Sequence, residues 1–206
     1  MSDQEQPQIY LITPPEFELS QFQAQLSSVL DSHAVACLRV SLATHDEDRI
    51  LRAADACREI CHARDVAIVI ASHIALAERL GLDGVHLGDG ARSVRKARKV
   101  LGPDAIVGAF CAGSRHEGMN AGEAGADYVA FGPLGASALG DGTQAEPELF
   151  QWWSEMIELP VVAEGALDES IVKALAPATD FFAIGEEIWT RDDPAAALGD
   201  LIGAMR

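Results

Sequence analysis

The chain has 206 residues, of which 49% are hydrophobic and 23% charged, and its formal net charge is −17. A chain of this length can form one globular domain without disulfide or metal staples, because folding buries roughly 70% of its surface. The charge excludes nucleic acid and anionic membranes as favourable partners, since their phosphate groups repel an acidic surface. We therefore expect a single domain spanning residues 1–206.

The first eight residues, 1–8, are polar and lack the basic region and apolar core of a secretory signal, so we expect a flexible tail. No apolar run approaches the roughly 20 residues that a membrane span requires. We expect a cytoplasmic protein, and reduced thiols at Cys37, Cys57, Cys61 and Cys111 would fit that compartment.

Short apolar runs alternate with longer segments of helical periodicity that are bounded by Gly, Pro, Asp or Ser. The strands are expected at 9–13, 36–40, 67–70, 84–87, 106–109, 128–131, 161–163 and 181–184. The helices are expected at 19–32, 46–64, 72–80, 93–101, 115–124, 146–157, 168–176 and 194–205. Runs such as 66–70 are apolar on both faces, as in parallel strands covered by helices.

Eight strand and helix pairs in a chain of this length favour the α/β class, and within it a closed (β/α)8 TIM barrel. A doubly wound sheet would place a glycine-rich turn after its first strand, where this chain has Thr13-Pro14-Pro15-Glu16. A small-molecule site is then expected at the mouth formed by the C-terminal ends of the strands. The Gly- and Ala-rich stretch 132–147 is a candidate lid over it.

Cys57 and Cys61 lie one helical turn apart and are followed by His62, a spacing loosely like a metal site. We favour two small apolar residues on a buried helix face, because zinc sites need further ligands at recognisable spacing. We expect no metal site there.

Four strings at the expected strand ends carry a resemblance to a known family. They are Cys37-Leu38-Arg39, Asp83-Gly84-Val85-His86-Leu87-Gly88, Gly125-Ala126-Asp127-Tyr128-Val129 with Gly132-Pro133, and Pro160-Val161-Val162-Ala163-Glu164-Gly165. From about Ile9 onward the chain resembles the thiamine phosphate synthase and TenI family. The resemblance implies a (β/α)8 barrel that forms a homodimer. The resemblance also implies the reaction of the synthase, in which a pyrimidine diphosphate loses pyrophosphate with the help of magnesium and joins a thiazole phosphate.

Compared with the family pattern, the chain departs at several positions that would hold magnesium or phosphate. Ser72 and Ala91 stand where the family has magnesium carboxylates, with Asp89 two positions from the second. Ser41 and Gly140 stand where it has phosphate-binding lysines. The strand-five pattern Gly-x-Ser-x-His has become 108–112, without its hydroxyl or imidazole. We therefore expect no magnesium or other cofactor.

Acidic residues replace neutral or basic family residues at the mouth, and the mouth is expected to carry negative charge from Asp89, Asp141, Glu164 and Glu186. We expect a divergent family member that lacks synthase activity and binds a small neutral or cationic ligand, such as a pyrimidine or thiazole, or a partner protein. The alternative is an active enzyme of altered specificity, such as a TenI-like thiazole tautomerase in which Cys111 and His73 move protons.

The candidate catalytic residues are Arg39, His73 and Glu164, and the candidate ligand-binding residues are Arg39, Asp89, Gly132, Gly165, Gly185 and Glu186. Structural alternatives stand beside them: Arg39 could pair with an acid inside the barrel, His73 could cap a helix, and Glu186 could complement a helix dipole. His86 is interpreted as structural support for its loop.

The adjacent Trp152 and Trp153 are expected to be exposed and to contribute to the homodimer contact, unless one of them faces the barrel.

Overall fold

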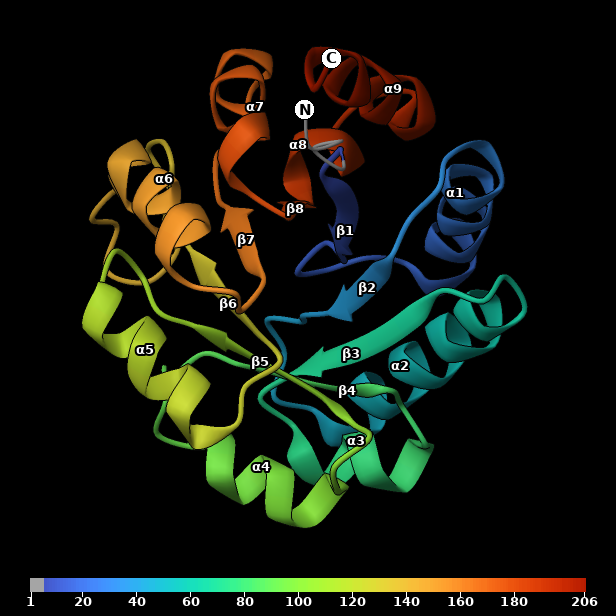
Figure 1. The fold of residues 1–206 in the computed structure, drawn as a ribbon. Coiled ribbons are helices and arrows are strands. Elements are labelled where there is room, and N and C mark those ends of the chain that lie inside the picture. The colour runs from blue at the N-terminus through green and yellow to red at the C-terminus, as the bar shows by residue number, and fades with distance from the viewer. Residues whose placement is uncertain (1–5) are drawn as a thin grey trace.

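The computed structural model describes residues 6–206 and shows eight parallel strands that close into a barrel in chain order, with helices around it (Figure 1). The strands are β1 Gln8–Ile12, β2 Cys37–Val40, β3 Ala67–Ala71, β4 Gly84–Leu87, β5 Ile106–Phe110, β6 Tyr128–Phe131, β7 Val161–Glu164 and β8 Phe181–Ile184. The expected (β/α)8 barrel is confirmed.

Eight helices follow the strands roughly where the periodicity places them. They are α1 Leu19–Ser32, α2 Glu47–His62, α3 Ile74–Leu80, α4 Val94–Leu101, α5 Arg115–Ala124, α6 Pro147–Met156, α7 Glu169–Leu175 and α9 Pro194–Ala204. The structure adds a 3-10 turn at Ala176–Ala178 and a short helix α8 at Glu186–Trp189. Four residues are too few to show a helical period, so this last helix escaped the sequence analysis.

The barrel closes where β1 pairs with β8, and Gln8 lies opposite Phe181 in that register. Gln8 is therefore part of the sheet, which shortens the tail expected at 1–8. Residues 1–5 of that tail lie outside the described residues.

Three aspartates explain part of the motif strings as supports at the N-terminal end of the barrel. Asp83, Asp127 and Asp180 stand just before β4, β6 and β8. Their carboxylates accept hydrogen bonds from the backbone N–H of residues 68, 107 and 161 in the preceding strands, at 2.8, 2.7 and 2.8 Å. These carboxylates brace the N-terminal end of the barrel, the end that serves stability rather than chemistry.

The larger core packs the outer face of the strands against the helices, and Cys57 and Cys61 are buried within it. This confirms the interpretation of a buried helix face, where burial raises the pKa of both thiols to about 12. A smaller core inside the barrel contains the residues Tyr10, Cys37, Val69, Tyr128, Ala130, Val162 and Ala183.

The expectation of an exposed tryptophan pair is wrong for one member. Trp153 is buried against Phe131, and its indole N–H donates to the Leu159 carbonyl at 2.8 Å. Trp152 is partly exposed, with the Arg115 guanidinium 4.5 Å from its ring centroid. The bulk of the indole drives the inner residue into the core, so only one ring is left for a surface contact.

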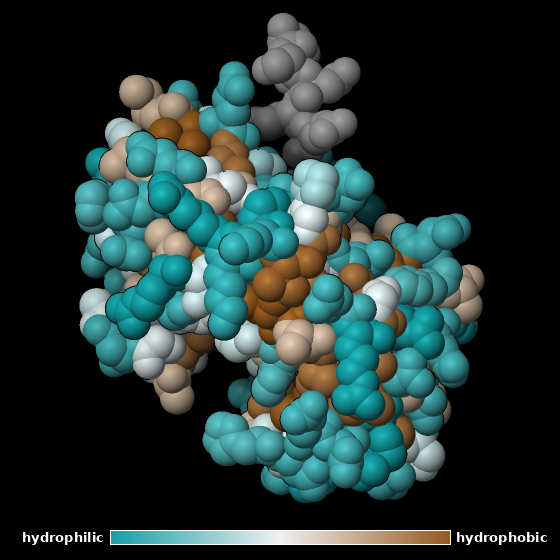
Figure 2. All heavy atoms as spheres, turned by 90° about the horizontal axis from the view of Figure 1, so that it is seen from below, coloured by the Kyte–Doolittle hydropathy of each residue, from teal (hydrophilic) through white to brown (hydrophobic). Residues whose placement is uncertain are grey.

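Polar side chains cover most of the face shown in Figure 2, as the charge of the chain requires, with hydrophobic residues gathered near its middle. Within residues 6–206, no helix combines the length and hydropathy needed to cross a bilayer.

Candidate functional site

A cavity of about 240 Å³ opens at the C-terminal ends of β1, β2, β7 and β8. Two residues of the Gly- and Ala-rich stretch, Ser137 and Leu139, also line it, so this stretch does lie against the mouth as expected of a lid. The lining comprises Ile12, Thr13, Pro15, Arg39, Ser41, Ser137, Leu139, Glu164, Gly165, Ala166, Ala183, Gly185, Glu186 and Glu187.

A buried ion pair crosses the barrel beneath this cavity. The Arg39 guanidinium on β2 donates from Nη1 to Oε2 of Glu164 on β7 at 3.2 Å, and from Nη2 to Oε1 of the same carboxylate. Arg39 and Glu164 are only 5% and 3% exposed. Burial alone would lower the pKa of Arg39, but the charge and hydrogen bonds of Glu164, together with Tyr10 and Tyr128, outweigh burial and raise that pKa, so the arginine is cationic. The two charges cancel in the floor of the mouth.

One donor of this pair is left unused. Nε of Arg39 is buried and has no hydrogen-bond partner within the part of the chain that the structure describes. A buried unpaired donor costs on the order of 1–3 kcal/mol, more on a charged group. An acceptor atom of a ligand that reached this donor would form the missing hydrogen bond.

A neutral hydrogen-bond chain lies near the ion pair inside the barrel. The hydroxyls of Tyr10 and Tyr128 are 2.7 Å apart, and Nδ1 of His86 lies 2.8 Å from the Tyr128 hydroxyl. Burial, and then the charge of Arg39, hold the pKa of His86 well below its usual 6.5. Gly108 makes room for this chain, because a Cβ there would lie 2.0 Å from the Tyr128 ring. His86 is therefore a structural residue, but it supports the barrel interior rather than its loop.

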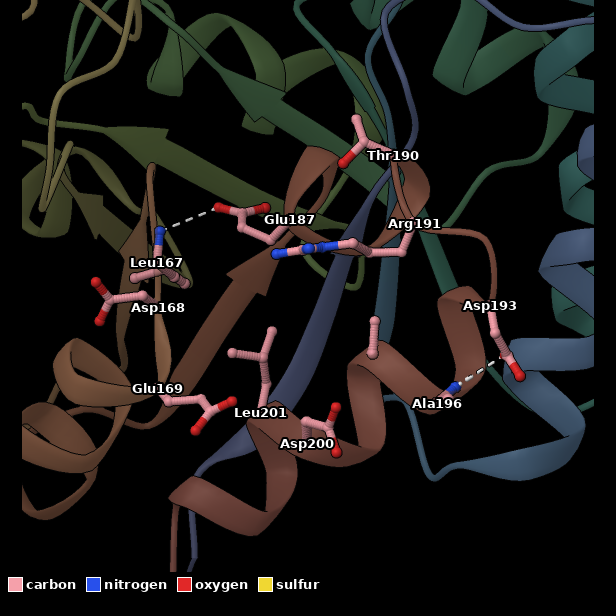
Figure 3. Close-up of a pocket in the computed structure, with 11 residues that line it drawn as sticks. Leu167, Asp168, Glu169, Glu187, Thr190, Arg191, Asp193, Ala196, Asp200 and Leu201 are labelled. Carbon is pink, nitrogen blue, oxygen red and sulfur yellow. Dashed lines mark hydrogen bonds between the residues drawn. The ribbon is translucent and has the colours of Figure 1, made fainter.

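Glu187 is a mouth residue that sequence reasoning missed. Its Oε2 accepts the backbone N–H of Gly185 at 2.7 Å, and its Oε1 accepts the backbone N–H of Leu167 at 3.2 Å (Figure 3). The carboxylate thus joins the loops that follow β7 and β8. The only signal in the sequence is an acid two positions after Gly185, the glycine that follows β8.

The structure brings five of the predicted site residues together and leaves two at a distance. Arg39, Glu164, Gly165, Gly185 and Glu186 all line the mouth. Gly132 lies against the floor, since a Cβ on it would sit 1.9 Å from the Glu164 carbonyl oxygen.

His73 and Asp89 do not line the mouth. His73 is the exposed N-cap residue of α3, and its side chain makes no capping bond. Asp89 is exposed and accepts the Ser93 hydroxyl at 2.6 Å. Both are turned toward solvent rather than into the cavity.

Of the four acids expected at the mouth, Glu164 and Glu186 line it, whereas Asp89 and Asp141 do not. Arg39 neutralises Glu164. Hydrogen bonds from Thr143 lower the pKa of Asp141, whereas clustered carboxylates would have raised it.

The proton-shuttle alternative lacks its groups. Cys111 is 3% exposed, and burial followed by the Glu117 charge raises the pKa of its thiol to about 12. Neither Cys111 nor His73 lines the mouth.

Carboxylates at the mouth do not fit a protein-held magnesium ion. Both oxygens of Glu164 accept from Arg39, and both oxygens of Glu187 accept from backbone N–H groups. Glu186 alone is left, and residues 6–206 contain no group of three His, Cys, Asp or Glu arranged for a metal.

Comparisons with known proteins agree over nearly the whole chain. The family model described as thiamine monophosphate synthase matches residues 9–188. The thiamine-phosphate synthase of Rhodospirillum centenum is 43% identical over 203 residues, covering 96% of this chain and 97% of that protein. That of Erythrobacter litoralis is 40% identical over 203 residues, covering 95% of each. Among solved structures, the thiamine phosphate pyrophosphorylase from Pyrococcus furiosus matches with a TM-score of 0.83 over 96% of this chain and 95% of its own, and at 20% identity this shows the fold alone.

Proposed function

The chain belongs to the thiamine monophosphate synthase family, and we propose that it joins a pyrimidine, supplied as its diphosphate, to a thiazole phosphate, releasing pyrophosphate and forming thiamine phosphate. The observation that carries this proposal is the full-length similarity to proteins named thiamine-phosphate synthase, at 43% identity over 96% of the chain.

This corrects the expectation of a divergent member without synthase activity, for which the tautomerase was the alternative. Three relatives named thiamine-phosphate synthase are 39–43% identical over at least 95% of this chain. The expectation rested on counting replaced positions and on an acidic mouth. The structure removes part of the second argument, because Glu164 is paired rather than free.

In the proposed reaction, Arg39 supplies the positive charge of the mouth. It is the only cationic side chain among the described residues that line the cavity. Although Glu164 offsets the net charge of the guanidinium, donors held in a fixed orientation stabilise the negative charge that develops on departing pyrophosphate. Glu164 is a positioning residue, because its two hydrogen bonds hold the guanidinium in one orientation.

The cavity at the mouth has too small a volume in this structure to hold both substrates of the proposed reaction. Its volume of about 240 Å³ lies below the roughly 300–1,000 Å³ typical of small-molecule sites. We infer that the segment carrying Ser137 and Leu139 withdraws to admit both substrates and then closes to exclude water.

Assembly and location are part of the same proposal. We infer a cytoplasmic homodimer, supported by the family resemblance and by exposed apolar side chains on and beside α5 and α6, where Met119 is 40% exposed and Met156 is 64% exposed. Light scattering at micromolar concentration is expected to give about twice the chain mass of 21.9 kDa. A single species at 21.9 kDa contradicts the dimer.

Genetic complementation tests the proposed activity. The gene is expressed in a bacterium whose own thiamine-phosphate synthase has been deleted, beside an empty vector. Growth without thiamine is expected only with the gene. Abundant soluble protein that supports no growth would contradict the proposal.

A further inference from the structure

Glu187 occupies two backbone donors at the loops that follow β7 and β8. In (β/α)8 barrels, the loops after strands seven and eight frequently bind phosphate through such donors. Here the N–H groups of Gly185 and Leu167 already bind the two oxygens of Glu187, at 2.7 and 3.2 Å. A carboxylate presents two charged acceptor oxygens to the donors, as a phosphate group does.

A second observation is an unpaired donor on a residue that lines the same cavity. Arg39 lines the same cavity as Gly185 and Glu187, and its buried Nε lacks a partner among the described residues. Gly185 lines the mouth and Leu167 lines a second cavity beside it, and Glu187 borders both, so its carboxylate stands between the two cavities.

We propose that Glu187 is an internal occupant of phosphate-binding donors and determines specificity, so that a phosphate-bearing substrate binds only by displacing its carboxylate from Gly185 and Leu167. This inference rests on the proposed function, because both substrates of that reaction carry phosphate groups. Glu187 lowers the affinity of the mouth for free phosphate, and substrates whose ring also contacts the cavity can still displace it.

The structure supplies a place for the displaced carboxylate. Glu187 lines both the mouth and a lateral cavity of about 600 Å³ bordered by α7 and α9. Arg191 also lines this lateral cavity, and its side chain extends toward Glu187 in Figure 3. Arg191 takes part in none of the ion pairs found within residues 6–206. Arg191 lies just beyond the end of α8, four positions after Glu187, and in this proposal its guanidinium receives the displaced carboxylate.

Titration calorimetry with inorganic phosphate tests the inference without turnover. Glu187→Gln removes the charge and one acceptor, and is expected to bind phosphate about tenfold more tightly than wild type. Asp200→Asn is the matched control, because Asp200 borders the lateral cavity but not the mouth, and this variant loses the same charge. It is expected to bind phosphate as wild type does. Equal affinities in Glu187→Gln and wild type, with both proteins folded by circular dichroism, overturn the inference.

Arg191→Gln gives an independent readout. Without the receiving guanidinium, Glu187 returns to its donors, so this variant is expected to bind phosphate several-fold more weakly than wild type. Unchanged affinity overturns the role of Arg191. Should Glu187→Gln fail to fold, Glu187→Ser is titrated in its place against the same outcomes.

Kinetics separate this inference from the proposed function. In an active enzyme, Glu187→Gln is expected to lower KM several-fold for the substrate whose phosphate takes these donors and to leave KM for the other substrate unchanged. Tighter phosphate binding in a protein that makes no thiamine phosphate would refute the proposed function and support the role of Glu187. If the protein makes thiamine phosphate but Glu187→Gln binds phosphate as wild type does, the proposed function is supported and the role of Glu187 is refuted.

Discussion

Replacing Glu164 with glutamine leaves the buried Arg39 guanidinium without its counter-charge. Arg39 is 5% exposed and Glu164 is 3% exposed, so water cannot compensate for the lost partner. Breaking a buried ion pair on one side costs about 3–5 kcal/mol. For a protein of this size, each kcal/mol changes Tm by about 2–4 °C. We therefore expect Glu164→Gln to lower Tm by roughly 10 °C in differential scanning calorimetry.

The double variant Arg39→Met with Glu164→Leu provides the control, since it removes both charges and fills the space with apolar groups. Replacing both partners of a buried pair is often neutral or stabilising. We expect its Tm to lie well above that of Glu164→Gln. A Glu164→Gln protein that melts within about 1 °C of wild type, or a double variant that melts below the single one, would refute the buried pair.

Three further predictions concern the barrel interior and the thiols. Because burial depresses the pKa of His86, only the unfolded chain takes up its proton below about pH 6.5, so the free energy of unfolding should fall by about 1 kcal/mol between pH 6.5 and 5.5. Urea titrations at several pH values check this. If the free energy of unfolding of His86→Gln falls with pH as steeply as that of wild type, the prediction is wrong. Gly108→Ala should destabilise by at least about 2 kcal/mol, because its Cβ would overlap an aromatic ring at 2.0 Å, whereas Gly203→Ala, with nothing within 4 Å, should stabilise slightly. Thermal unfolding of the pair decides it, and equal Tm values would contradict the packing. Cys57 and Cys111, with pKa values raised to about 12 by burial, should resist alkylation at pH 7.5 until the protein unfolds. Rapid labelling of either thiol in the folded protein, followed by mass spectrometry, would show that it is accessible.

The strands could be placed from the sequence to within about a residue, because both of their faces are apolar and short polar turns bound them. The short helix α8 could not, because Glu186–Trp189 is held by tertiary contacts, among them the Trp189 indole N–H, which donates to the Ile12 carbonyl at 2.7 Å. Local periodicity carries no trace of such a contact.

The sequence indicates which residues belong to the site better than it indicates which groups they bind. An acid partner for Arg39 was weighed, but the pair joins residues 125 positions apart across the barrel. His73 was placed at the mouth because it follows β3, yet Ser72 has φ 63° and the histidine side chain is exposed. Glu187 was missed because its role depends on a backbone N–H 20 positions earlier.

Turnover by the purified protein tests the central claim most directly. The protein is incubated with magnesium, pyrimidine diphosphate and thiazole phosphate, and thiamine phosphate and pyrophosphate are both quantified against a reaction without enzyme. We predict equal amounts of the two products over many turnovers. Folded protein that yields no thiamine phosphate above the enzyme-free reaction would contradict the assignment.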